Sequence, residues 1–280
     1  MKKPLFPNDV KKSLPLWKWV LLILFGSTLF LFLSQMVYVV GCFSDNLWIK
    51  ALLLFLGGCL VLGLYVLFVR VFEKRIITEL RLGAIPDLLA GFAIGTLFIA
   101  SVVGIFELIG VYRIASINVS WSTLLLDFSS LSIVAISEEI IFRGIIFRMI
   151  ESRFNMVAAF IISSLIFGFM HLVTVDLWTA VAISAEAGFL LAAAYKLHHN
   201  LWLPIGIHWA WNFISGTVFG FEISGNLPES GLIIPEINGP YILSGGNNGF
   251  EGSIITCICG ITLGLALYYY GKRLSGKEVQ

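Results

Sequence analysis

The stretch Ala135–Phe147, AISEEIIFRGIIF, places Glu138, Glu139 and Arg143 inside a run that is otherwise apolar. Charged side chains within a membrane segment cost roughly 2.5–3.5 kcal/mol each on insertion scales, so they are rare and usually functional. Whether this run lies in a membrane therefore decides both the fold and the meaning of the three charges.

The composition of the whole chain favours a membrane protein. Of 280 residues, 58% are hydrophobic and 12% are charged, whereas about 25% of the residues in soluble domains are charged. Apolar runs of about 18 residues or more recur along the chain, and each is long enough to cross a bilayer as a helix. The runs do not alternate polar and apolar residues, which excludes a membrane β-barrel. The sequence therefore predicts an all-α polytopic membrane protein.

Charge and cysteine content exclude several other classes of protein. The net charge of +1 gives no sign of a nucleic-acid partner. The four cysteines lie in or at the edges of apolar runs, and their spacing matches neither a zinc site nor a disulfide framework. The first apolar run is too long for the h-region of a cleavable signal peptide. We expect no cofactor.

The apolar runs predict eight transmembrane helices, at about residues 16–42, 47–72, 86–112, 122–148, 156–174, 177–197, 203–222 and 253–271. The longest connection, about 223–252, is rich in Gly, Pro and Asn, and we expect it to be an irregular surface loop outside the membrane.

The distribution of positive charge predicts the orientation of these helices. With eight spans, 15 of the 18 Lys and Arg residues fall on the side of the two termini. Lys50 and Arg113 fall on the other side, and Arg143 lies within a helix. Because Lys and Arg accumulate on the cytoplasmic side of membrane proteins, we expect a multi-pass cell-membrane protein with both termini cytoplasmic.

The first cluster of polar residues within a predicted helix consists of Glu138, Glu139 and Arg143. Glu139 and Arg143 are four residues apart, so they share a helix face and can neutralise each other. Glu138 points about 100° away from Glu139 around the helix and has no partner in its own helix. A structural ion pair would account for Glu139 and Arg143 but not for Glu138, which we therefore interpret as a functional carboxylate.

Two further groups supply imidazole and amide side chains. His171 follows Phe167 by four residues, and His208 precedes Asn212 by four. Each spacing places both side chains on one helix face. Taken alone, His171 is also explained as a hydrogen-bonded core residue, and His208 with Asn212 as a polar clamp between helices.

Together, a carboxylate, an imidazole and an imidazole–amide pair are what hydrolysis of an amide by water requires. A carboxylate near a neutral His can hold a water and take its proton, and donors aimed at the developing oxyanion stabilise the tetrahedral intermediate. Along their helices, His208 lies about 8 Å, Glu138 and Asn212 about 15 Å, and His171 about 22 Å from the cytoplasmic ends. A single site requires these depths to converge in a polar intramembrane cavity, which we expect to open toward the cytoplasm.

Three short motifs resemble those of a known family. The stretches SEEIIFRG, FGFMH and HWAWN are similar to the EExxxR, FxxxH and HxxxN motifs of the CPBP family. These are the CAAX proteases and bacteriocin-processing enzymes, also called intramembrane glutamic endopeptidases. The resemblance covers about 81–271, including the stretch ILSGGNNGFEGS, which resembles a loop of bacterial members. It divides the chain into an N-terminal cytoplasmic segment with two helices (1–80), a membrane protease core (81–271) and a cytoplasmic tail (272–280).

The resemblance implies roles for the residues of the three motifs. Glu138 would be the general base that activates a water, and His171 would hold the same water. His208 and Asn212 would form the oxyanion site. The substrate would be a peptide or a membrane-anchored protein, which need not be prenylated.

The resemblance also implies that Glu139 and Arg143, the other two charged residues of the EExxxR motif, would shape and support the site. The chain lacks HExxH, and the oxyanion role suits the second His better than a zinc ligand does, so we expect a metal-independent enzyme.

Two other functions are compatible with the sequence. The chain could be a catalytically silent family member that acts as a membrane scaffold or immunity protein. A proton-coupled transporter using isolated acids is least favoured, because we find no internal repeat. These acids fit no motif, and their role is left open: Glu107, Asp127 and Glu186.

Overall fold

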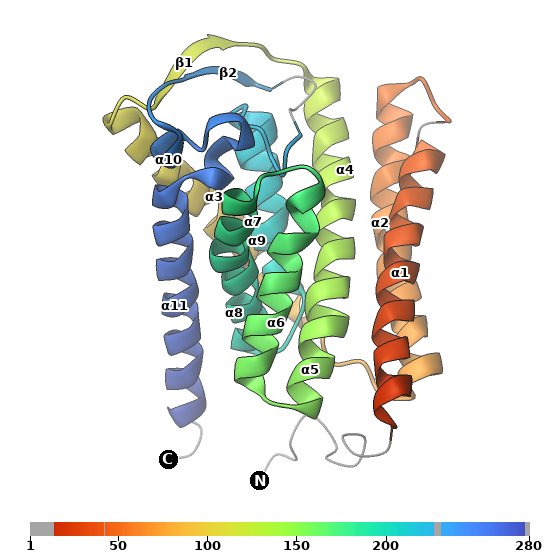
Figure 1. Ribbon diagram of the computed structural model, residues 1–280. Helices are drawn as coiled ribbons and strands as arrows, with labels where there is room; N and C mark the ends of the chain where they lie inside the picture. Colours follow the sequence, from red (N-terminus) through yellow and green to blue (C-terminus); the bar gives the residue numbers. More distant parts are fainter. Residues whose placement is uncertain (1–13, 42, 227–230, 278–280) are drawn as a thin grey trace.

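The computed structural model describes residues 14–41, 43–226 and 231–277, which form a bundle of roughly parallel helices (Figure 1). The first and last described residues lie at the same end of the bundle, which we call the terminal end; the opposite end is called the distal end (Figure 1). Some residues used in the sequence predictions lie outside the described ranges: Lys2, Lys3, Lys11, Lys12, Cys42, Glu229 and residues 278–280 of the tail.

Four of the helical segments are single helices or have a short extension. They are α1 (Leu16–Gly41), α2 (Leu47–Phe68) with a π-helical extension Val69–Glu73, α3 (Pro86–Leu108) preceded by the 3-10 turn Leu82–Ala84, and α11 (Ile254–Lys277).

Four further segments change helix type along their length. α4 (Trp121–Glu139) continues through the π-helical segment Ile140–Phe147 into α5 (Arg148–Arg153), and α6 (Met156–Phe169) ends in the 3-10 turn Met170–Val173. α7 (Leu177–Ile183) passes through the π-helical segment Ser184–Gly188 into α8 (Phe189–His198), and α9 (Trp202–Asn212) continues as the π-helical segment Phe213–Val218. Each predicted helix range overlaps one of these segments.

Six helical segments within the described residues are long and apolar enough to cross a membrane: Leu16–Gly41, Leu47–Glu73, Leu82–Leu108, Met156–Val173, Leu177–His198 and Ile254–Leu274. The predicted class, an α-helical multi-pass membrane protein, is therefore confirmed. The segments α4–α5 and α9 are not among the six, and they carry the predicted polar motifs EExxxR and HxxxN.

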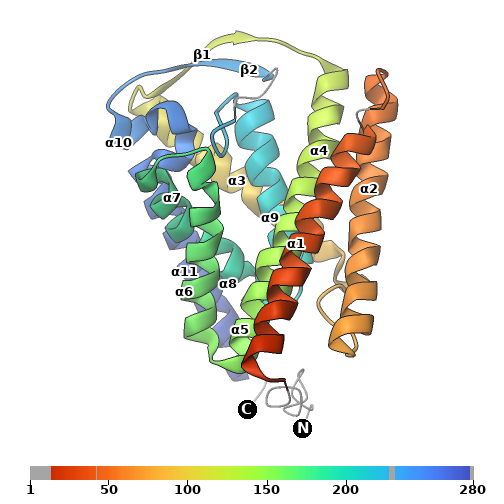
Figure 2. The same cartoon turned by 45° about the vertical axis from the view of Figure 1, so that its right-hand side comes forward.

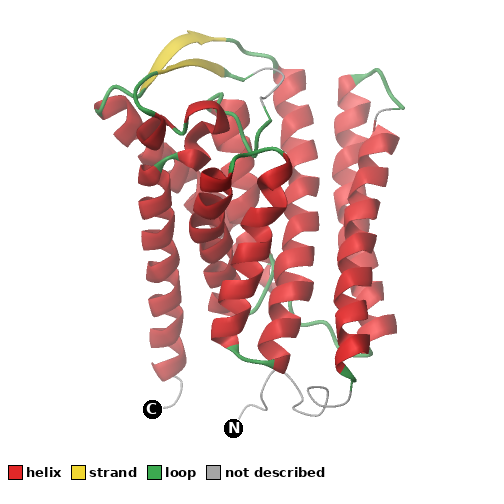
Figure 3. Cartoon of the chain, in the orientation of Figure 1, coloured by secondary structure: helices red, strands yellow, loops and turns green. Residues whose placement is uncertain are grey.

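Two short strands depart from the predicted organisation. β1 (Tyr112–Ile117) pairs antiparallel with β2 (Ile233–Ile237) at the distal end (Figure 3). The expectation that the third helix reaches residue 112 was wrong, because α3 ends at Leu108 and Gly110 adopts a φ of +76°. A residue in this left-handed conformation ends a helix, and Gly adopts it without steric cost.

The connection 223–252 is more ordered than predicted. Besides β2, it contains the short helix α10 (Tyr241–Ser244) and the 3-10 segment Gly246–Gly252. Several of its residues are buried against the bundle, including Phe250 and Glu251. The prediction of an irregular surface loop is therefore wrong for much of this stretch.

Close packing positions the helix that carries the HxxxN motif. A Cβ atom built on Gly206 in α9 would lie 2.2 Å from the backbone oxygen of Leu88 in α3, closer than any side chain allows. Membrane helices commonly approach one another through such small residues. The contact fixes α9 against α3. On the other side of the bundle, α1 crosses α4 and packs against Ile140–Phe147 (Figure 2).

Candidate active site

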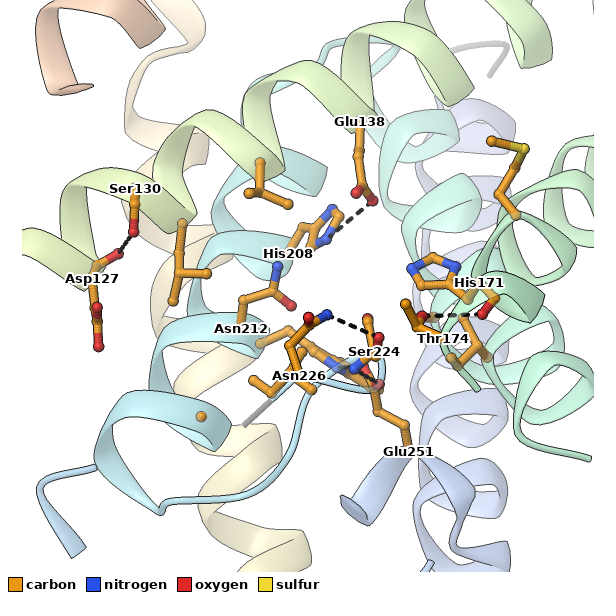
Figure 4. A pocket seen from close by; sticks show the side chains of 18 of the residues that line it. Asp127, Ser130, Glu138, His171, Thr174, His208, Asn212, Ser224, Asn226 and Glu251 are labelled. Carbon is orange, nitrogen blue, oxygen red and sulfur yellow. Dashed lines mark hydrogen bonds and ion pairs between the residues drawn. The ribbon is translucent and has the colours of Figure 1, made fainter. Parts of the chain in front are cut away.

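A cavity of about 560 Å³ lies between α4, the end of α6 and α9. Glu138, His171, His208 and Asn212 line it. Figure 4 shows the four side chains around a common space, with His171 on the wall opposite His208 and Asn212. The different depths calculated along separate helices therefore converge on one cavity.

The remaining two predicted residues form an ion pair behind the cavity wall. Arg143 Nη1 lies 2.7 Å from Glu139 Oε1, and both side chains are fully buried. Arg143 Nη2 donates to the backbone oxygen of Gly188 at 3.0 Å, and the guanidinium carbon lies 4.6 Å from the ring centre of Phe167. The buried charge of Arg143 is thus compensated by an ion pair and a further hydrogen bond, as a buried cation requires.

His208 connects this ion pair to the cavity. Its Nδ1 lies 2.9 Å from Glu139 Oε1, and its Nε2 lies 3.7 Å from Glu138 Oε2 (Figure 4). Because Glu139 also pairs with Arg143, its carboxylate acts as an acceptor, so Nδ1 of His208 carries a proton. Nε2 is then the ring nitrogen on the side of Glu138 and the cavity.

Glu138 differs from its neighbour Glu139 in exposure and in partners. About 25% of the Glu138 side chain is exposed, whereas the Glu139 side chain is fully buried. Glu138 Oε2 has no hydrogen-bond partner among the described residues. This carboxylate is therefore placed to bind a group that enters the cavity.

His171 lies in the 3-10 turn at the end of α6. Its Nδ1 lies 2.8 Å from the backbone oxygen of Phe167. Since a carbonyl oxygen only accepts, Nδ1 is the donor, and the neutral ring has a lone pair on Nε2. The ring centre of Phe167 lies 5.2 Å from that of His171 and 5.8 Å from that of His208, so one aromatic side chain packs against both imidazoles.

Glu251 is a cavity residue that the sequence interpretation missed. It lies near the end of the predicted loop, lines the same cavity and is only 3% exposed. Its Oε1 accepts from Trp211 Nε1 at 3.0 Å, and its Oε2 accepts from the backbone N–H of Ser224 at 2.7 Å. Burial raises the pKa of this carboxyl, an effect opposed by the hydrogen bonds from Ser224 and Trp211. The resemblance of GGNNGFEGS to a family loop was the one signal that could have drawn attention to it.

The isolated acids have three different environments. Asp127 lines the cavity, and Thr217 Oγ1 donates to its Oδ2 at 3.1 Å. Glu186 is fully buried, and neither carboxyl oxygen has a hydrogen-bond partner among the described residues. Glu107 is exposed. Of the three, only Asp127 contributes to the cavity.

The cavity opens in the direction opposite to the predicted one. Its lining includes Thr174, Ser224 and Asn226, which belong to connections at the distal end, and no residue of the connections at the terminal end. The expectation of an opening on the side of the termini was wrong. The depths along separate helices give no sign that the loop at 223–226 forms part of the cavity wall.

The long apolar helices define a multi-pass helical membrane protein, and the cavity between its helices is lined by Glu138, His171, His208 and Asn212. Among the described residues, no group of three or more His, Cys, Asp or Glu side chains is arranged to hold a metal ion.

Comparison with known families adds the chemical class. The family model described as "Type II CAAX prenyl endopeptidase Rce1-like" matches residues 120–214. The suspected resemblance to CAAX proteases is thereby confirmed for this segment, which contains all three motifs. The match supports a CAAX-type membrane endopeptidase and does not favour a silent scaffold or immunity protein. No curated protein and no solved structure gave a match.

Proposed function

We propose that the protein is a metal-independent intramembrane endopeptidase in which Glu138 and His171 activate a water. Glu138 takes a proton from the water as the water oxygen attacks the carbonyl carbon of the scissile peptide bond. His171 Nε2 accepts a hydrogen bond from the other hydrogen of the water. When the C–N bond breaks, Glu138 passes its proton to the leaving amine and returns to a carboxylate.

The negative oxygen of the tetrahedral intermediate is stabilised by donors from α9. Asn212 donates from its side-chain amide. His208 donates from Nε2, which requires protons on both ring nitrogens because Nδ1 already binds Glu139. Glu139 and Arg143 hold the ring in position without reacting themselves.

We propose that α4–α5 and α9 cross the membrane together with the six apolar helices, which gives eight spans. Their ionisable residues pair with one another or line the cavity, an arrangement that makes charges tolerable in a membrane. The distribution of Lys and Arg supports a cytoplasmic location of both termini in the cell membrane. The substrate is a peptide or a membrane-anchored protein, and the core extends over 81–271.

The single observation that carries this proposal is the convergence of Glu138, His171, His208 and Asn212 on one cavity. The test is cleavage of a peptide library by the purified full chain in detergent. We expect Glu138→Gln to lower the rate about 10²–10⁴-fold, the usual contribution of a general base. Glu107→Gln, which changes an exposed acid outside the cavity, is the matched control. Unchanged cleavage by Glu138→Gln would remove Glu138 as the base.

The same assay tests the proposed independence of a metal. Wild-type cleavage is expected to persist after incubation with a strong chelator. Inhibition that is reversed by adding back a divalent metal would show that the reaction uses one.

A further inference from the structure

The two ends of the bundle differ sharply in positive charge. At the terminal end, the described residues carry eleven Lys and Arg residues: Lys18, Arg70, Lys74, Arg75, Arg81, Arg148, Arg153, Lys196, Lys272, Arg273 and Lys277. At the distal end, the described residues carry Lys50 in the first turn of α2 and Arg113 in β1. Because Lys and Arg are retained on the cytoplasmic side, this asymmetry places the terminal end in the cytoplasm and the distal end outside it.

The cavity opens toward the distal end, where positive charge is scarce. Thr174, Ser224 and Asn226 line its outer part, and Glu138 and His208 line its inner part (Figure 4). Lys50 also lines it, which confirms that the cavity extends to the level of the first turn of α2. A substrate that reaches Glu138 through this opening therefore comes from the side away from the termini.

The rim of the cavity is apolar on the flank where α1 faces the end of α6. Met170 and Val173, next to His171, are 53% and 91% exposed, and both line the cavity. Leu31 and Tyr38 of α1 line it as well and are also exposed. Exposed apolar side chains on a membrane protein face lipid, so this flank suits a segment arriving from within the bilayer better than a polar peptide arriving from water.

We infer that the substrate is a membrane-anchored peptide segment that enters the cavity from the extracytoplasmic half of the bilayer and is cut there. This inference rests on the proposed endopeptidase function. It specifies the side of the membrane from which the substrate enters, and it selects the membrane-anchored protein from the two substrate classes proposed above. The released fragment accordingly leaves on the extracytoplasmic side.

Cysteine labelling tests the orientation without any measurement of activity. In a chain whose four native cysteines are replaced by alanine, Asn226→Cys marks the cavity mouth and Ile76→Cys marks the terminal end. Both positions are exposed. We expect a membrane-impermeant maleimide added to intact cells to label Asn226→Cys, and to label Ile76→Cys only after permeabilisation. The opposite pattern would overturn the inference, whatever the enzyme cleaves.

Two single-span reporter proteins then test the substrate. They carry the same cleavable segment, in one case just inside the extracytoplasmic half of the span and in the other just inside the cytoplasmic half. Co-reconstituted with wild-type protein, the first is expected to be cut and the second to remain intact, with no cutting by Glu138→Gln. Cutting of the cytoplasmic reporter alone would overturn the inference and leave the endopeptidase function standing. Cutting of neither reporter, in an assay where soluble library peptides are cleaved, would overturn the anchored state of the substrate.

Discussion

Glu139 and His208 lie on different helices, α4 and α9, and are joined by a hydrogen bond of 2.9 Å between Oε1 and Nδ1. The same carboxylate oxygen pairs with Arg143 at 2.7 Å. One buried oxygen therefore neutralises a cation and fixes the orientation of an imidazole whose other nitrogen faces Glu138. Glu139, the second Glu of the EExxxR motif, thus connects this motif to His208 of the HxxxN motif.

Replacing Glu139 with Gln is expected to reduce both stability and activity. The amide keeps the shape of the side chain but leaves the buried charge of Arg143 without its ion-pair partner. Removing one member of a buried pair costs about 3–5 kcal/mol, which thermal unfolding in detergent should detect.

A double variant separates the two effects of Glu139. Glu139→Gln with Arg143→Met removes both charges, so we expect stability to recover relative to Glu139→Gln alone. Activity should stay low, because His208 still lacks the carboxylate that orients it. Wild-type activity in the double variant would show that Glu139 acts only through Arg143.

Asn212→Ala is expected to lower kcat by about 10²–10³-fold, the usual effect of losing one oxyanion donor. KM should change little, since the hydrogen bond forms with the intermediate rather than with the substrate. Steady-state kinetics with a library-derived peptide provide the measurement, and Asn118→Ala, at an exposed position outside the cavity, is the matched control. An increase in KM with an unchanged kcat would assign Asn212 to substrate binding instead.

Glu251→Gln is expected to disturb the position of α9 and of the loop beyond it. The carboxylate accepts from Trp211 with one oxygen and from the Ser224 N–H with the other. A Gln side chain has only one acceptor oxygen, so one of the two buried donors loses its partner, at a cost of about 1–3 kcal/mol.

Because Glu251 positions other groups, its replacement should have a different kinetic signature from that of Glu138. We expect a lower unfolding temperature and changes in both KM and kcat, whereas Glu138→Gln should affect mainly kcat. Glu222→Gln changes a neighbouring, partly exposed acid and serves as the control. A loss of kcat alone, with wild-type stability, would instead indicate that Glu251 takes part in the reaction.

Local helix geometry made part of the site predictable from the sequence. The i,i+4 spacing correctly paired Glu139 with Arg143 and left Glu138 pointing elsewhere, because both relations lie within one helix. Long apolar runs likewise identified the membrane class, since the length needed to cross a bilayer is fixed.

Relations between distant segments were not predictable in the same way. The hydrogen bond from His208 to Glu139 spans 69 positions in the chain, and periodicity carries no information about such pairs. Glu251 looked like a loop acid because its burial depends on Trp211 and Ser224, which belong to other segments. The direction of the cavity opening was missed for the same reason, since the loop at 223–226 forms part of its wall.

An ionic network at the terminal end supports the helix that carries the ion pair. Tyr65 Oη lies 2.7 Å from Glu79 Oε1 and 2.9 Å from the backbone oxygen of Gly144, in the π-helical segment that contains Arg143. Arg148 Nε donates to the same oxygen of Gly144 at 2.8 Å. Glu79 is therefore connected to the site through Tyr65 and the backbone of this segment.

The ionisation of Glu79 predicts how stability depends on pH. Burial disfavours its charged form, but the hydrogen bond from Arg75 and the charges of Arg148 and Arg75 outweigh burial and lower its pKa from 4.5 to about 2. A carboxyl with a lowered pKa stabilises the fold fully above its ordinary pKa, and this contribution is lost as the pH falls toward the folded value. The shift corresponds to about 3 kcal/mol.

We therefore expect Glu79→Gln to be less stable than wild type near neutral pH, and the difference to shrink as the pH is lowered from 4.5 to about 2. Unfolding in detergent at a series of pH values measures this difference directly. Glu236→Gln, which alters an exposed acid in β2, should give the same stability as wild type at every pH. A difference between Glu79→Gln and wild type that did not change with pH would mean that Glu79 contributes through shape and hydrogen bonding alone, with its charge playing no part.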